Sequence, residues 1–144
     1  AELRQLSRTL TDPSIEKKNI YDLFSDECDR INELKLCDVA LICSNRNIAL
    51  PYQTKSILLR IAQEFFQNSI KHSSCKKIIV ILNAVDKNIS LTLGDDGVGF
   101  KLENLPKKGI GIQNMKKRTE LLNGNFVIES KKNTGTKVTI TLPA

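Results

Sequence analysis

The hydrophobic positions of this chain follow two periods, one typical of helices and one typical of strands. Apolar residues recur at spacings of three and four in four segments: residues 1–11, 19–34, 54–72 and 109–122. In the first segment Leu3, Leu6 and Leu10 form an apolar stripe, and Asp12-Pro13 ends it because proline cannot continue a helix. The third segment has no glycine or proline and predicts the longest helix.

Short β-rich runs account for much of the remaining chain. They cover residues 37–43, 77–84, 89–93, 125–129 and 137–142. Residues 85–88 predict a hairpin between the second and third runs, and residues 131–136 join the last two. This order predicts an α+β fold in which helices and a mostly antiparallel sheet form two layers.

The composition fits one domain, since 144 residues of which 40% are hydrophobic can bury a single core. No apolar run approaches the roughly 20 residues that span a bilayer, and the start lacks the apolar stretch of a signal peptide. We therefore expect a soluble, cytoplasmic piece. It opens on a helical segment without an initiator Met, so we expect a longer protein, other parts of which could include a membrane segment.

The four cysteines and the single histidine, His72, show no spacing typical of metal ligands, so structural zinc is not expected. The cysteines lie in or beside apolar runs, which predicts buried free thiols in a reduced protein. The formal charge of +6 comes largely from scattered lysines, with five Phe and two Tyr. This favours a solvated surface with some attraction for a polyphosphate, and no nucleic-acid partner is expected.

The helix predicted over residues 54–72 is the first of four places where chemistry is expected. At 100° per residue, Glu64, Asn68 and Lys71 project within about a sixth of a turn of one another. One amide oxygen together with phosphate oxygens suits Mg²⁺, and Lys71 can neutralise phosphate charge. Glu64 would orient a metal-bound water or act as a base. An ordinary solvated helix face explains the same residues equally well.

The other three places are glycine-containing turns. After a predicted strand, the Asp95 carboxylate can accept from an exocyclic amine such as that of adenine, and Gly97 and Gly99 let the backbone approach a flat ligand. Gly109-Ile110-Gly111-Ile112 opens a helix whose free N–H groups suit phosphate. Thr136 can place a hydroxyl at a pocket floor. Taken singly, these segments are also explained as a hairpin turn, a loop end and a second hairpin turn.

In this order and spacing, the four segments resemble the ATPase superfamily shared by DNA gyrase B, Hsp90, the MutL repair proteins and histidine kinases. Residues 64–72 resemble the kinase N box, Asp95-x-Gly97-x-Gly99 the G1 box, Gly109-x-Gly111 with Asn114-Met115 and Arg118 the G2 box, and Thr134-Gly135-Thr136 the last conserved turn. The similarity runs from about Leu50 to the C-terminus. It implies a Bergerat-type fold, with a mixed sheet packed against three helices and the nucleotide between the helical layer and a lid.

The resemblance also implies a role for each matched residue. Asn68 binds Mg²⁺, Asp95 accepts from the adenine amine, Lys71 and His72 face the phosphates, Gly97 and Gly99 shape the adenine pocket, Gly109 and Gly111 let the lid close beside Ile112, and Thr136 supports adenine. Glu64 is assigned to activation or to metal hydration. ATP and Mg²⁺ are the ligands implied.

The variant that this chain resembles is the group of sensor kinases that partner LuxR-type (NarL-like) response regulators. In that group an ELR-x-LS stretch ends the dimerisation and phosphotransfer hairpin, so residues 1–12 would be its stump and residues 13–144 the catalytic domain. The sole histidine, His72, belongs to the N box, so the acceptor histidine is expected on the rest of that hairpin in a homodimeric full-length kinase. The alternative is an ATP-binding regulatory module of the anti-sigma-factor or serine-kinase type, which acts by protein contact.

Overall fold

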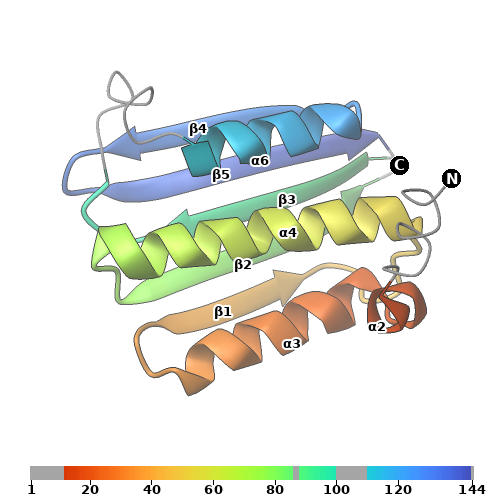
Figure 1. The fold of residues 1–144 in the computed structure, drawn as a ribbon, viewed down its shortest axis with the longest axis horizontal. Coiled ribbons are helices and arrows are strands. Elements are labelled where there is room, and N and C mark those ends of the chain that lie inside the picture. The colour runs from red at the N-terminus through yellow and green to blue at the C-terminus, as the bar shows by residue number, and fades with distance from the viewer. Residues whose placement is uncertain (1–11, 86–87, 100–109, 144) are drawn as a thin grey trace, which may run out of the picture.

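The computed structural model describes residues 12–85, 88–99 and 110–143, without the side chains of residues 72, 73, 85 and 110. Five strands form one sheet in the order β1-β2-β3-β5-β4 (Figure 1). The strands are β1 (Asp38–Cys43), β2 (Lys77–Val85), β3 (Asn88–Asp95), β4 (Asn125–Lys131) and β5 (Gly135–Pro143). Strands β1 and β2 are parallel, and the other neighbouring pairs are antiparallel. The predicted strands and the hairpin between β2 and β3 are confirmed.

The helices lie together over one face of the sheet (Figure 1). They are α2 (Pro13–Lys17), α3 (Ile20–Glu33), α4 (Tyr52–Asn68) and α6 (Ile110–Leu121), and a π-helical turn, η1 (Ser69–Ser73), continues α4. Helix α4 packs between α3 and α6. None of the helices in the described part of the chain is long and apolar enough to cross a bilayer. The predicted α+β class with two layers, and with a mixed, mostly antiparallel sheet, is confirmed.

The core lies between the two layers because strand side chains alternate between the faces of the sheet. Val80, Leu91 and Ile140 point into the helical layer and are 0% exposed. On the opposite face Ile42 and Ile79 are 51% and 40% exposed. One face of the sheet is therefore covered by helices, and the other remains open in the described structure.

Side-chain caps fix where α2 and α3 begin. The Asp12 Oδ1 atom accepts a hydrogen bond of 2.9 Å from the peptide N–H of Ser14, and Pro13 occupies the first turn of α2. The Asn19 side chain accepts from the N–H of Asp22 in the same way. Asp12-Pro13, expected as a helix end, thus begins a helix, and the helix predicted over residues 1–11 lies outside the described residues.

The long helix differs from its prediction at the C-terminal end. The α-helical hydrogen bonding stops at Asn68, and the backbone continues as a π-helix to Ser73 before Ser74 turns into the left-handed region with φ 53°. A π-helix contains more residues per turn than an α-helix, so side chains after Asn68 do not follow the 100° spacing used above.

All four cysteines are free thiols, and those at 28, 37 and 75 are buried while Cys43 is half-buried. Burial raises the pKa of Cys28 to about 12, and burial together with the neighbouring Cys75 raises the pKa of Cys37 to about 11. None of the four forms a disulfide, and the prediction of burial holds for three of them.

Candidate functional site

Asp95, the last residue of β3, is the centre of a hydrogen-bond network. Its Oδ2 atom accepts from the Ser69 hydroxyl at 2.7 Å, and its Oδ1 atom accepts from the peptide N–H groups of Gly97 at 3.0 Å and Thr136 at 3.2 Å. The donors come from the first residue of η1, directly after α4, from the loop after β3 and from β5. The bond from Gly97 makes residues 95–97 an Asx turn, so the sequence Asp-Asp-Gly here orders a carboxylate and does not close a hairpin.

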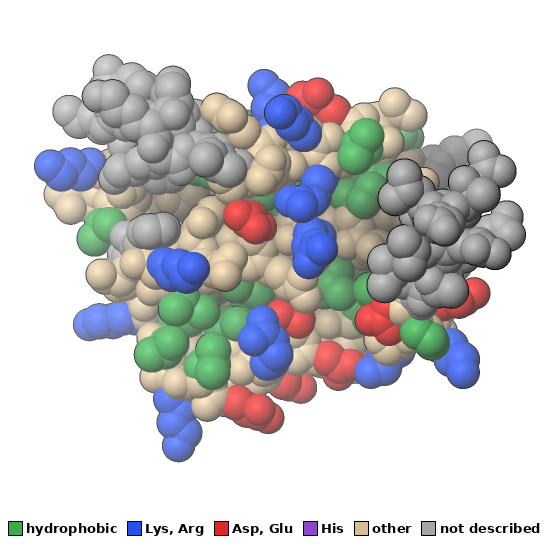
Figure 2. Space-filling view, in the orientation of Figure 1, with side chains coloured by type: hydrophobic (Ala, Val, Ile, Leu, Met, Phe, Trp, Pro, Cys, Tyr) green, Lys and Arg blue, Asp and Glu red, His purple; other side chains and the backbone are tan. Residues whose placement is uncertain are grey.

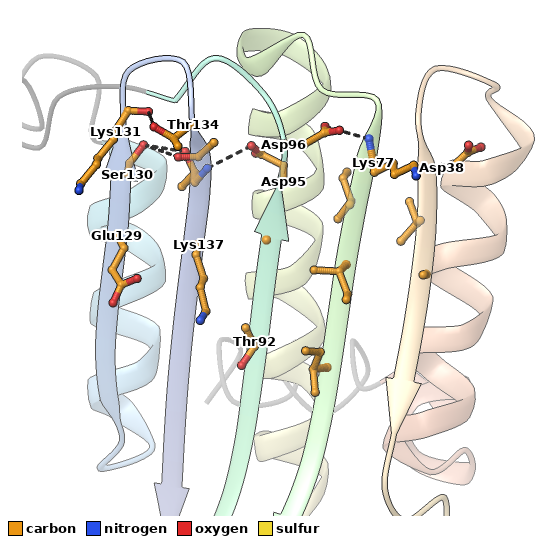
Figure 3. A pocket seen from close by; sticks show the side chains of 18 of the residues that line it. Asp38, Lys77, Thr92, Asp95, Asp96, Glu129, Ser130, Lys131, Thr134 and Lys137 are labelled. Carbon is orange, nitrogen blue, oxygen red and sulfur yellow. Dashed lines mark hydrogen bonds between the residues drawn. The ribbon is translucent and has the colours of Figure 1, made fainter.

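The β4–β5 turn supports this carboxylate from the other side. Asp95 and Thr136 are register partners in β3 and β5, and the Thr136 hydroxyl lies 2.9 Å from that of Ser130 (Figure 3). Gly135 has φ +102°, and a Cβ atom there would lie 2.2 Å from the carbonyl oxygen of Asp95. Only glycine fits so close to the neighbouring strand. The turn therefore requires Gly135 to hold Thr136 beside the carboxylate.

Gly99 brings the loop after β3 against the same turn. Its φ is +63°, and a Cβ atom there would meet the carbonyl oxygen of Lys131 at 2.1 Å. The peptide N–H of Asn133 donates to the carbonyl of Val98, which joins the loop to the β4–β5 turn. The predicted importance of glycine at this position thus has a geometric cause.

Asp96, next to Asp95, has a separate structural task. Its Oδ1 atom accepts from the peptide N–H groups of Lys76 at 2.8 Å and Lys77 at 3.0 Å, at the start of β2 (Figure 3). The N–H groups of Lys77 and Lys76 lower the pKa of the Asp96 carboxyl below its usual value. Of the two adjacent carboxylates, Asp96 accepts from the start of β2 and Asp95 accepts from Ser69, directly after α4.

Glu64, Asn68 and Gly111 lie together where α4 meets the N-terminal end of α6. A Cβ atom on Gly111 would be 2.7 Å from Oε1 of Glu64 and 3.0 Å from Nδ2 of Asn68. Both side chains are half-buried. A carboxylate, an amide and the peptide N–H groups in the first turn of α6 therefore converge at one place. Gly111 leaves room for their close approach. A glycine that merely ended a loop would not need this space.

Lys71 lies in η1, the π-helical turn that continues α4. It is exposed and borders a hollow of about 390 Å³ between α3 and α4, together with Arg30, Arg60 and Glu64. Figure 2 shows basic and hydrophobic side chains next to each other on this part of the helical face. Glu64 and Lys71 therefore border one hollow. Glu64 borders both this hollow and the contact between α4 and the start of α6.

The remaining predicted positions divide into two groups. Ile112 is half-buried and packs against the core, so its side chain supports α6. Gly109 and the side chain of His72 lie outside the described residues.

A larger hollow, of about 950 Å³, lies on the open face of the sheet and is bordered by Thr92, Lys137 and, at the strand ends, Asp95 (Figure 3).

A comparison with known protein families matches residues 53–144 to the histidine kinase-, DNA gyrase B- and HSP90-like ATPases. The chain belongs to this family. The matched span includes all four segments discussed above, from Glu64 to Thr136. It also agrees with the extent of the resemblance predicted from about Leu50 onward.

Curated members of the family that resemble the chain are histidine kinases. The oxygen sensor histidine kinase NreB of Staphylococcus carnosus (strain TM300) is 36% identical over 92 residues, which is 63% of this chain and 26% of NreB. The signal transduction histidine-protein kinase/phosphatase DegS of Bacillus subtilis (strain 168) is 35% identical over 94 residues, 63% of this chain and 24% of DegS. The sensor histidine kinase LiaS of the same strain is 25% identical over 142 residues, 99% of this chain and 39% of LiaS. The chain thus spans well under half the length of each.

Solved structures share the fold of this ATPase domain. The histidine kinase domain of the blue-light activated histidine kinase from Erythrobacter litoralis EL346 superposes with a TM-score of 0.64 at 21% identity, covering 81% of this chain and 57% of that one. A structure of that kinase gives 0.66 at 20% identity, covering 83% and 40%. These likenesses support the arrangement of sheet and helices.

Two residues of the site were not predicted from the sequence. Ser69 is buried, and its hydroxyl donates to Asp95. Ser130 is buried at the end of β4 and contacts Thr136. A serine on the inner face of an otherwise apolar helix or strand was the available signal, because a buried hydroxyl needs a hydrogen-bond partner.

Proposed function

We propose that this chain binds Mg-ATP and transfers the γ-phosphate to a histidine on a separate dimerisation and phosphotransfer hairpin, as the catalytic domain of a two-component sensor kinase. The observation that carries the proposal is the pairing of two places on α4 and η1. Ser69 holds the Asp95 carboxylate, and the preceding residue, Asn68, lies against Gly111 at the start of α6. Two consecutive residues, Asn68 and Ser69, thus contact both groups that a nucleotide needs. Ser69 contacts the carboxylate that can accept from a base, and Asn68 lies beside the N-terminus of α6.

The adenine end of the proposed site is Asp95. An ionised carboxylate is an acceptor only, so it suits the exocyclic amine of adenine and repels a carbonyl oxygen at the same place. Gly97 and Thr136 fix its Oδ1 atom through backbone N–H groups, and Gly99 brings the neighbouring loop close. Such rigid placement of a polar group favours specificity, because little conformational freedom is lost on binding.

The phosphate end is formed by Asn68, Glu64 and the start of α6. Free N–H groups and the positive end of a helix dipole attract phosphate, and Gly111 lets them approach. The Asn68 amide oxygen fits a Mg²⁺ ligand, with phosphate oxygens and water as the others. Mg²⁺ neutralises charge on the phosphates when it is bound. Glu64, beside Asn68, would orient a water of that ion or the incoming acceptor.

Phosphoryl transfer depends mainly on positioning and charge neutralisation, which these groups supply. Lys71, His72 and Gly109 are assigned to the phosphates and the lid, with Ile112 supporting the helix start from the core side. The names of the relatives support a histidine as acceptor. We place this histidine on the hairpin of a homodimeric, cytoplasmic kinase module as part of the proposal. A response regulator of the NarL/LuxR type is the proposed recipient of the phosphoryl group.

Two substitutions test the site by isothermal titration with ATP, with and without Mg²⁺. Asp95→Asn is expected to abolish nucleotide binding, because it replaces an acceptor by a group that also donates. Asn68→Ala is expected to remove the dependence of ATP affinity on Mg²⁺. Asp96→Asn is the matched control, since Asp96 bonds only to the start of β2 among its described hydrogen bonds, and it should bind Mg-ATP like the parent. Normal Mg²⁺-dependent binding by both site variants would refute the assignment.

A further inference from the structure

The Asp95 carboxylate has a hydrogen-bond inventory that leaves one position for a ligand. A carboxylate offers about four lone-pair sites, two on each oxygen. Two peptide N–H groups, of Gly97 and Thr136, occupy Oδ1. The Ser69 hydroxyl occupies one site on Oδ2. Within the described residues, the remaining acceptor site is therefore on Oδ2, beside the serine.

Ser69 is well placed to set the direction of that remaining site. It is 1% exposed, and its hydroxyl lies 2.7 Å from Oδ2. Its backbone is held at both ends, since its N–H donates to the carbonyls of Phe65 and Phe66 and its carbonyl accepts from the Cys75 thiol at 3.7 Å. The donor is thus fixed by the helix, and the carboxylate cannot rotate about its last bond without losing the contact.

The two donors on Oδ1 alone do not fix Oδ2 in the same way. Both come from strand and loop backbone on the sheet side of the site, whereas Ser69 comes from the helical layer. A hydrogen bond from the opposite side holds the carboxylate plane between the two layers. Hydrogen bonds weaken steeply when donor and acceptor are misaligned, so the orientation of this plane decides how well Oδ2 meets a ligand donor.

We propose that Ser69 is a positioning residue that sets base specificity: its hydroxyl orients Asp95 so that the free site on Oδ2 meets the exocyclic amine of a 6-aminopurine. The inference rests on the proposed nucleotide function and adds a residue to it. Ser69 does not contact the base in this proposal; it acts through the carboxylate. A 6-oxopurine places an acceptor opposite Oδ2, and a purine with hydrogen at position 6 offers no donor there.

The test compares two nucleotides in two proteins by isothermal titration with Mg²⁺. ATP carries the amine, and purine riboside triphosphate has hydrogen in its place. The parent chain should bind ATP about 10- to 100-fold more tightly than the analogue, as expected for one hydrogen bond to a charged group. In Ser69→Ala this ratio should fall by roughly threefold to tenfold, with the affinity for the analogue nearly unchanged.

A merely structural role would lower both affinities together and leave their ratio as in the parent, which would overturn the proposal. Thr119→Val is the matched control. Its hydroxyl is also buried, but it donates to the Met115 carbonyl within α6, so its removal should keep the parent ratio. If the parent itself binds both nucleotides equally, the role of Asp95 in the proposed function fails and the role of Ser69 fails with it. A parent that discriminates, next to an equally discriminating Ser69→Ala, refutes Ser69 alone.

Discussion

Gly111→Ala should weaken ligand binding while it changes the stability of the fold very little. The added Cβ atom would lie 2.7 Å from Glu64 Oε1 and 3.0 Å from Asn68 Nδ2. The carboxylate must therefore retreat by about 0.7 Å to reach ordinary contact distance. Alanine favours a helix over glycine by up to about 1 kcal/mol, whereas overpacking costs about 1–3 kcal/mol. Because the atoms met are the ends of rotatable side chains, the free energy of unfolding should change by no more than about 1 kcal/mol.

Binding should respond much more strongly. Displacing Asn68 or Glu64 weakens an interaction with a charged group, which is worth about 1.5–3 kcal/mol, so the affinity for Mg-ATP should fall about 10- to 100-fold. Thermal unfolding and isothermal titration measure the two effects on the same samples. Gly94→Ala is the matched control, because a Cβ there faces Ile79 at 3.3 Å on the open side of the sheet. Parent-like Mg-ATP affinity in a folded Gly111→Ala would refute the placement of the phosphate end.

Three further outcomes are expected away from the ligand. Lys55→Met should lower the free energy of unfolding in urea by about 1–3 kcal/mol without changing ATP affinity, since this buried ammonium donates to the carbonyls of Glu16, in α2, at 3.0 Å and Lys18, just after it, at 2.8 Å. An unchanged midpoint would contradict that role. Asp96→Asn should lower the free energy of unfolding at neutral pH, and this difference from the parent should disappear on acidification below pH 3.8, the usual carboxyl pKa. The reason is that the folded state lowers the pKa of Asp96, so the carboxyl stabilises the fold only when it is ionised. A pH-independent difference would contradict this. Iodoacetamide at pH 8 should modify Cys28 and Cys37 far more slowly in native than in urea-unfolded protein. The pKa values of about 12 and 11 leave roughly one thiol in 10³ to 10⁴ ionised in the native protein. Equal rates would refute the burial of these thiols.

Much of the fold follows from local patterns. Alternating positions such as Val138, Ile140 and Leu142 identify the inner face of β5, and three- and four-residue spacing identifies α3 and α4. The beginning of α2 was missed because Asp12-Pro13 can end one helix and cap the next. The structure shows the beginning of α2 at this point, while the helix predicted over residues 1–11 lies outside the described residues.

The site is predictable to the extent that motifs place its residues. Asp95, Asn68 and Gly111 were expected from spacing and resemblance, and the structure places Asn68 against Gly111. The π-helical turn η1 was not predictable, since hydrophobic periodicity does not distinguish an α-helical turn from a π-helical one. The hydrogen bond from Ser69 to Asp95 joins residues 26 positions apart and depends on how the helix packs on the sheet.

The transfer of phosphate to a histidine is the central claim and can be measured directly. The chain is mixed with Mg²⁺, ATP labelled at the γ-phosphate and the dimerisation and phosphotransfer hairpin of the same full-length kinase. The proposal predicts acid-labile, base-stable label on a hairpin histidine, lost when that histidine is replaced or when Asp95→Asn is used, and no label on this chain. Clear Mg-ATP binding with acid-stable label on serine, or with no label on the hairpin, would contradict it.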